Sequence, residues 1–157
     1  MKTVAFTTLG CRVNQYDTDA MKGLFLQNNY EAVGFDEKAD IYVINTCSVT
    51  NMGEKKSRQL IRKAKRQNSN AYVIVTGCYA QLAPDAIAAI EGVNLVIGTN
   101  NRSKIVELVE QLESTERQIN AVRDIMKESN FEEMPLFGNE SDKARAFMKI
   151  QEGCNNY

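Results

Sequence analysis

Short apolar runs, rich in Val, Ile, Phe and Tyr, recur through the first two thirds of the chain. The runs at 41–46 and 72–77 are almost continuously hydrophobic, which is typical of parallel strands buried on both faces. A weaker apolar run, Tyr30–Val33, follows Asn28-Asn29 and precedes Gly34. The pattern predicts five strands, at residues 3–8, 30–33, 41–46, 72–77 and 94–98.

The segments between these runs carry apolar residues at helical spacing. They predict helices that begin near Asn14, Asn51, Pro84 and Arg102, and Asn14 is expected to cap the first, with Asp17 three residues on. Alternating strands and helices predict an α/β fold of the flavodoxin or Rossmann type, with three layers. We expect a mostly parallel sheet of about five strands, ordered 2-1-3-4-5, with helices on both faces. Residues 35–40, between the second and third strands, are too few for a crossover helix.

The chain becomes more polar after residue 111. Residues 119–125 fit either a strand or a short helix, and residues 144–150 again resemble a strand. We predict a first domain over residues 1–113, a connector over 114–143, and the truncated start of a second domain over 144–157. A strand at 144–150 without its neighbours is expected to be disordered or to exchange between copies of the chain.

Composition limits the chemistry that is available. The chain has 157 residues and a net charge of −1, and it contains no histidine. Histidine-based catalytic triads and histidine zinc sites are therefore excluded. The absence of an apolar run of about 20 residues, and of a signal-peptide pattern, predicts a cytoplasmic protein, in which cysteines are usually free, catalytic or bound to metal.

Three of the four cysteines occupy equivalent places. Cys11, Cys47 and Cys78 each follow the carboxyl end of a predicted strand and precede a predicted helix. Ligands of open α/β sheets bind at that edge, and three neighbouring strand ends span roughly 10 Å. Thiolates without histidine favour an iron–sulfur cluster or a thiolate-rich zinc site. We therefore predict that the three sulfurs converge on one small metal cluster and leave one metal position open.

Two other interpretations compete with this one. A single cysteine at such a place is most simply a small buried residue that fills space. A nucleotide site is also conceivable at this edge, but residues 9–14 (LGCRVN) contain neither a GxGxxG nor a Walker pattern.

The predicted second helix is strongly basic. Residues 54–66 contain seven lysines and arginines and one glutamate, a net charge of +6 that leaves −7 on the rest of the chain. Lys55, Arg58, Arg62 and Lys65 fall on one row of the helix, which predicts contact with the phosphates of RNA. The competing interpretation is an ordinary solvated helix face.

Residues 10–17 (GCRVNQYD), 45–50 (NTCSVT) and 76–81 (TGCYAQ) together resemble the N-terminal domain of the radical-SAM methylthiotransferases. Residues 149–157 (KIQEGCNNY) resemble the entry to that family's CxxxCxxC motif. Residues 50–59 (TNMGEKKSRQ) are most similar to the branch that acts on N6-threonylcarbamoyladenosine beside the tRNA anticodon. The resemblance covers almost the whole chain.

This resemblance implies that Cys11, Cys47 and Cys78 hold an auxiliary [4Fe-4S] cluster, whose open iron carries the sulfur to be inserted. It implies that Cys154 is the first ligand of a second [4Fe-4S] cluster, which works with S-adenosylmethionine in a radical-SAM domain. A C-terminal RNA-binding domain would complete the enzyme, with tRNA as its substrate. The sequence departs from the family pattern because it stops before the second and third cysteines of CxxxCxxC. We therefore expect the isolated chain to be catalytically silent.

Three alternatives stay open at this point. The first is a sibling methylthiotransferase that acts on isopentenyladenosine in tRNA or on a ribosomal protein. The second is a structural α/β module that binds zinc through thiolates. The third is a plain RNA-binding module that depends only on the basic helix.

Overall fold

The structure is a computed structural model, and it describes residues 1–47, 51–124, 127, 132–134 and 150. Its centre is a six-stranded sheet in the order β2-β1-β3-β4-β5-β6, with every pair of neighbours parallel. The five predicted strands and their order are confirmed, and a sixth strand extends the sheet. The strands are β1 (Thr3–Thr8), β2 (Glu31–Val33), β3 (Ile41–Thr46), β4 (Tyr72–Gly77), β5 (Val93–Val96) and β6 (Ile119–Asn120).

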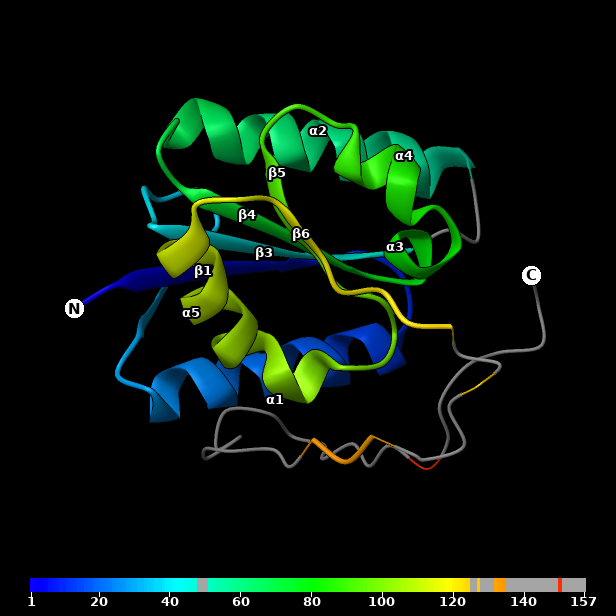
Figure 1. The fold of residues 1–157 in the computed structure, drawn as a ribbon. Helices are drawn as coiled ribbons and strands as arrows, with labels where there is room; N and C mark the ends of the chain where they lie inside the picture. The colour runs from blue at the N-terminus through cyan, green and yellow to red at the C-terminus, as the bar shows by residue number, and fades with distance from the viewer. Residues whose placement is uncertain (48–50, 125–126, 128–131, 135–149, 151–157) are drawn as a thin grey trace.

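Helices cover both faces of the sheet, as the sequence predicted (Figure 1). One layer contains α1 (Arg12–Gln27) and α5 (Ile105–Thr115), preceded by the short 3-10 helix η1 (Arg102–Lys104). The other layer contains α2 (Asn51–Gln67), α3 (Cys78–Leu82) and α4 (Pro84–Ala88). The helix predicted near Pro84 is therefore preceded by a separate helical turn that begins at Cys78.

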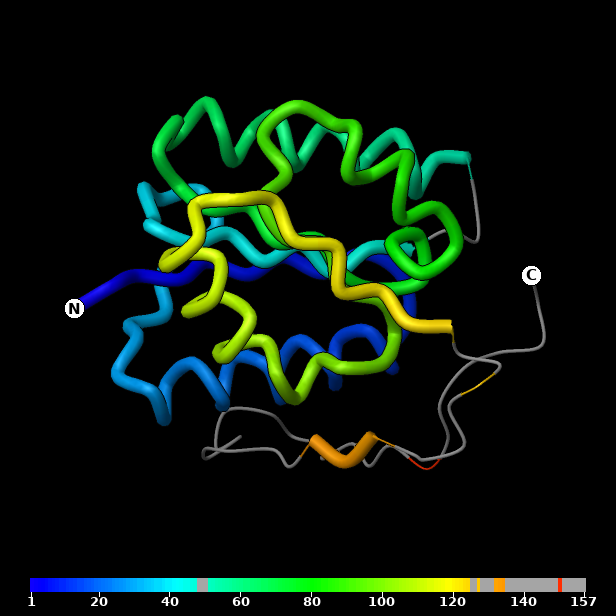
Figure 2. The backbone as a smooth tube through the Cα atoms, viewed as in Figure 1, coloured from blue at the N-terminus to red at the C-terminus, as the bar shows by residue number. Residues whose placement is uncertain are grey.

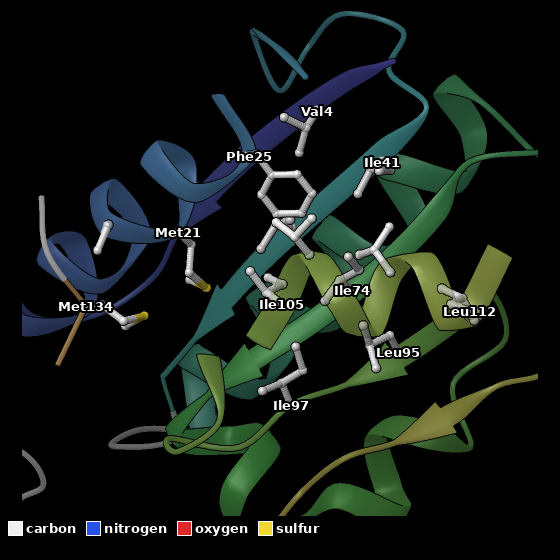
Figure 3. Close-up of a cluster of buried hydrophobic side chains, with 14 residues drawn as sticks. Val4, Met21, Phe25, Ile41, Ile74, Leu95, Ile97, Ile105, Leu112 and Met134 are labelled. Atoms are coloured by element: carbon white, nitrogen blue, oxygen red, sulfur yellow. The ribbon is translucent and has the colours of Figure 1, made fainter. Parts of the chain in front are cut away.

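The two central strands are buried along their length because each helix layer packs an apolar core against one face. All six residues of β3 are buried. One core contains Met21 and Phe25 of α1 and Leu112 of α5, and Figure 3 shows these side chains as parts of one apolar cluster along the sheet. The other core contains Ile61 and Ala64 of α2. Side chains that alternate along one strand thus enter different cores, which explains why the sequence of β3 is hydrophobic without alternation.

The connection between β2 and β3 needs no helix. Strand β2 has only three residues, so the chain must travel only about 10 Å to return to the start of β3. A hydrogen bond from Asp40 N to Thr3 O, 3.2 Å long, fixes the end of this connection beside the start of β1. The ring of Phe35 packs edge-on against Tyr42, with centroids 5.4 Å apart.

Residues 119–125 were expected to form either a strand or a short helix. The first two of them, Ile119 and Asn120, form strand β6. After α5 the chain returns to the sheet, where Ile119 pairs with Leu95 and Asn120 with Val96 (Figure 2). The sheet thus continues past residue 113, where we expected the first domain to end. The domain boundary itself stays a prediction.

Part of the expected second domain lies outside the described residues. Residues 135–149 and 151–157 are among those not described, so the strand predicted at 144–150, its exchange between copies and the position of Cys154 are not tested by the structure. Within the described ranges, no helix is both long enough and apolar enough to cross a membrane.

Candidate metal centre

The three predicted cysteines follow three adjacent strands. β1 pairs with β3, and β3 pairs with β4, with Thr8 opposite Asn45 and Thr46 opposite Gly77. Cys47 and Cys78 are the next residues after that second pair, and Cys11 lies three residues beyond the end of β1. The structure therefore brings all three loops to one edge of the sheet, the carboxyl edge, as predicted.

The loop that carries Cys11 is in close contact with Cys47. Gly10 adopts a φ of +97°, and a Cβ atom built on it would lie 2.7 Å from the Cβ and 2.9 Å from the Sγ of Cys47. Glycine is required here because a side chain would meet both an unfavourable backbone conformation and the neighbouring cysteine. The same backbone geometry recurs at Gly77, where φ is +100° and an added Cβ would lie 2.5 Å from Asn45 Oδ1.

The three side chains do not converge as the ligands of a single ion would. Among the described residues, no group of three Cys, Asp or Glu side chains is placed to hold one metal ion. Cys11 is exposed, Cys47 and Cys78 are partly exposed, and these three form no disulfide with one another. The geometry brings the loops together, while a common focus of the three sulfurs stays a prediction.

The donor set is of the type that holds an iron–sulfur cluster. A polynuclear cluster is bound through separate iron atoms, so its cysteines stand farther apart than the ligands of one zinc ion. Three thiols at one accessible edge, with no histidine in the chain, match the ligand chemistry of such a cluster. Cys11, Cys47 and Cys78 are thus suitable in type and location, and the exposure of Cys11 leaves the site open to solvent.

A network of buried polar side chains lies beneath these loops. The side-chain amide of Asn14 donates to the carbonyl oxygens of Leu9, at 2.8 Å, and Thr46, at 3.0 Å, and so joins the loop of Cys11 to the loop of Cys47. Thr46 Oγ1 donates to Thr76 O at 2.6 Å and joins β3 to β4. Apart from Ser57, every described polar residue that is buried belongs to this network, namely Asn14, Asp17, Thr18, Asn45, Thr46, Thr76 and Arg102.

An ion pair between α1 and η1 extends this network. Arg102 of η1 pairs with Asp17 of α1, and the two side chains are only 2% and 1% exposed. The Nε of Arg102 also donates to Thr76 Oγ1, at 3.3 Å. The helix that follows Cys11 is thereby fixed to the strand that precedes Cys78. The sequence singled out Asp17 but assigned no such role to Arg102.

The prediction that Asn14 caps α1 is wrong. The helix begins at Arg12, its N-cap residue is Cys11, and no side chain caps it. Asn14 sits inside the first turn, where its amide group serves as a donor to two loop carbonyls rather than as an acceptor for helix N–H groups. Asp17 likewise is not part of a capping box, because its carboxylate pairs with Arg102.

The profile described as "Uncharacterized protein family UPF0004" matches residues 3–98, which include all three cysteine loops and the basic helix. The chain belongs to family UPF0004. The matched segment ends just after β5, so the family's shared sequence corresponds to the first five strands of the sheet.

Curated relatives of this UPF0004 chain are methylthiotransferases. It is 52% identical to the threonylcarbamoyladenosine tRNA methylthiotransferase MtaB of Bacillus subtilis, over 100% of this chain and 35% of the relative. It is 46% identical to the MtaB of Aquifex aeolicus, over 98% of this chain and 37% of the relative. A ribosomal protein uS12 methylthiotransferase RimO from Trichodesmium erythraeum is 32% identical, over 98% and 34%. The chain thus spans about a third of the length of these relatives.

Among solved structures, a chain from the structure of two RcsB dimers bound to two parallel DNAs is similar in fold. It matches with a TM-score of 0.53 and 11% identity, covering 76% of this chain and 63% of that chain. At this level of identity the likeness concerns the α/β fold alone.

The structure separates the predicted RNA-binding residues of this UPF0004 chain. Arg58, Arg62 and Lys65 line an open groove beside α2, whereas Lys55 does not. Lys65 Nζ donates to Ala71 O at 2.7 Å, and burial lowers the pKa of this lysine. Lys63, on another side of the helix, pairs with Asp36.

Proposed function

We propose that this chain is the N-terminal domain of a tRNA methylthiotransferase that converts N6-threonylcarbamoyladenosine, next to the anticodon, to its 2-methylthio derivative. Membership of UPF0004 and 52% identity to a relative named for that activity support the proposal. Because the chain spans about a third of such relatives, the reaction itself belongs to the longer enzyme, and the isolated chain is expected to be inactive.

The observation that carries this proposal is the arrangement of the cysteine loops. Cys11, Cys47 and Cys78 follow three adjacent strands, β1, β3 and β4, and a buried polar network braces their loops from below. In this proposal the three thiolates hold an auxiliary [4Fe-4S] cluster, which supplies the sulfur for the methylthio group. The chain's own part is to hold the three loops at one edge and to leave that edge accessible through the exposed Cys11.

The rest of the enzyme is proposed from the family resemblance. Cys154, which lies outside the described residues, would be the first ligand of a second [4Fe-4S] cluster that requires S-adenosylmethionine. A radical-SAM domain and a C-terminal RNA-binding domain would follow, and the enzyme would act on tRNA in the cytoplasm.

Anaerobic reconstitution of the 157-residue chain with iron and sulfide tests the cluster assignment. We expect about four irons per chain and the broad visible absorption of a cluster. Cys47→Ala should abolish this uptake, whereas Cys154→Ala serves as the matched control and should retain it. Equal uptake by the triple variant of Cys11, Cys47 and Cys78 would show that the assignment is wrong.

The alternatives predict different results. A structural zinc module would contain stoichiometric zinc after aerobic purification and would not assemble a cluster. A sibling enzyme is suggested by the 32% identity to a relative named as a ribosomal protein uS12 methylthiotransferase. Expression of the full-length gene in a host that lacks its own enzyme, followed by analysis of tRNA nucleosides and of the ribosomal protein, distinguishes these substrates.

A further inference from the structure

An open groove of about 1150 Å³ runs between α2 and the segment that connects α4 to β5. Arg58, Arg62, Lys65 and Arg66 of α2 form one wall, and small or apolar residues with a single acidic side chain, Glu91, form most of the other. The groove therefore carries a net charge of +3, whereas the whole chain carries −1. Such a difference concentrates the positive potential of the molecule in one hollow.

Two of these arginines are available to a ligand. The side chains of Arg62 and Arg66 are exposed and form no ion pair with any residue that the structure describes. Lys65 is different, because its ammonium group already donates to the carbonyl oxygens of Ala71 and Ser69. The groove thus offers two guanidinium groups that form no ion pair with the described part of the chain, and guanidinium binds phosphate oxygens in a bidentate manner.

The groove is connected to the cysteine edge. Arg58, at one end of the row, donates from Nη2 to the hydroxyl of Tyr79 at 3.3 Å, and Tyr79 directly follows Cys78. The eight residue steps from Arg58 to Arg66 extend about 12 Å along the helix. This length corresponds to three or four nucleotides at about 3.4 Å per nucleotide along the axis of one strand.

We propose that the groove between α2 and α4 binds the phosphate backbone of the RNA substrate, through Arg62 and Arg66, and leads one strand towards the cysteine loops. No aromatic side chain is among the described residues that line the groove, so the contact follows backbone charge rather than base identity. The identity of the RNA as tRNA rests on the proposed function, whereas phosphate recognition rests on the groove itself.

Binding of an unmodified tRNA transcript to the 157-residue chain, measured across a series of salt concentrations, tests this proposal. In the double variant Arg62→Glu/Arg66→Glu, affinity should fall at least tenfold, and the slope of log K against log salt should decrease by about 1.4 to 1.8, because two phosphate contacts are lost. The control is Lys22→Glu/Lys104→Glu, which makes the same change in charge at exposed positions of α1 and η1, on the opposite layer of the molecule (Figure 1). The control should change affinity less than twofold.

Equal losses in the two double variants would overturn the proposal, because they would indicate general charge attraction only. Unchanged binding and salt slope in the groove variant would overturn it as well. Adenosine triphosphate and inorganic phosphate are added as competitors, and displacement of the transcript by either at micromolar concentration would instead indicate a site for a small phosphorylated ligand. Since the chain is tested without iron, a failure to assemble a cluster leaves this result interpretable.

Discussion

Arg102 and Asp17 form an ion pair that is almost completely sealed inside the protein, beneath the loops that carry the cysteines. Arg102→Met should destabilise the chain by about 3 to 5 kcal/mol, because it leaves the carboxylate of Asp17 buried without its partner. The change in the free energy of unfolding can be measured by urea denaturation monitored by circular dichroism.

The double variant Asp17→Leu/Arg102→Met controls for the loss of the side chain itself. Replacement of both partners by apolar residues removes the uncompensated charge, so the double variant should be more stable than Arg102→Met alone. If the single variant were as stable as the double variant, the buried carboxylate of Asp17 would carry no cost without Arg102, and the ion pair would not be what compensates its burial.

Asn14 holds two cysteine loops together through one amide group. Asn14→Ala should lower the free energy of unfolding by about 2 to 4 kcal/mol, because the buried carbonyl of Thr46 and the partly buried carbonyl of Leu9 lose their donor. It should also reduce iron uptake, since the loops of Cys11 and Cys47 are no longer joined. Both quantities are measured on the same preparation, by urea denaturation and by iron analysis after anaerobic reconstitution.

Asn28, the C-cap residue of the same helix, provides the matched control. Its amide donates to Leu24 O at 2.8 Å in an exposed position, so Asn28→Ala should cost less than about 1 kcal/mol and leave iron uptake unchanged. Equal iron uptake by the Asn14 variant and wild type would contradict a role for the two Asn14 hydrogen bonds in positioning the cysteines.

Most of the sheet could be predicted because its strands are hydrophobic without interruption and its helices have a clear apolar stripe. The network beneath the cysteines could not. Arg102 lies 85 residues from Asp17 in the sequence, and a single arginine at the start of a helix carries no signal that it will be buried. Asn14 was misassigned because asparagine near a helix start is an equally good N-cap and loop bracket, and only the position of Thr46 decides between these roles.

The lining of the groove also could not be predicted from the sequence alone. The helical row through Arg58, Arg62 and Lys65 was visible in the sequence, but which cations face a hollow depends on where α4 packs. The packing places Arg66 in the groove and leaves Lys55 outside it. Strand β6 has only two residues, so its pairing with β5 depends on tertiary contact rather than on a hydrophobic run.

Gly10 is required by its neighbour as well as by its backbone. Gly10→Ala should destabilise the chain by about 1 to 2 kcal/mol because of its positive φ, and the added Cβ should also displace Cys47 and so reduce iron uptake. Gly92→Ala is the matched control: its φ is +96°, and its added Cβ would meet the flexible side chain of Lys65, far along α2 from Cys47. Iron uptake should fall only in the Gly10 variant, and an equal fall in both would show that general destabilisation is responsible.

The ion pair between Lys2 and Glu113 should make stability depend on pH at the alkaline end. The hydrogen bond to Glu113, 2.6 Å long, raises the pKa of Lys2 above its ordinary value. The folded chain therefore holds this proton more tightly than the unfolded chain, and the stabilisation is complete below the unfolded pKa of about 10.4. It then declines as the pH rises and is lost above the raised folded pKa.

Because Lys2 is largely exposed, the difference in unfolding free energy between wild type and Lys2→Met should be only about 0.2 to 1 kcal/mol near pH 8. Urea denaturation of both proteins from about pH 8 to about pH 11, with Lys22→Met as the control at an exposed lysine, measures this difference. A difference that stays constant or grows with pH would show that the Lys2 ammonium is not stabilised by Glu113.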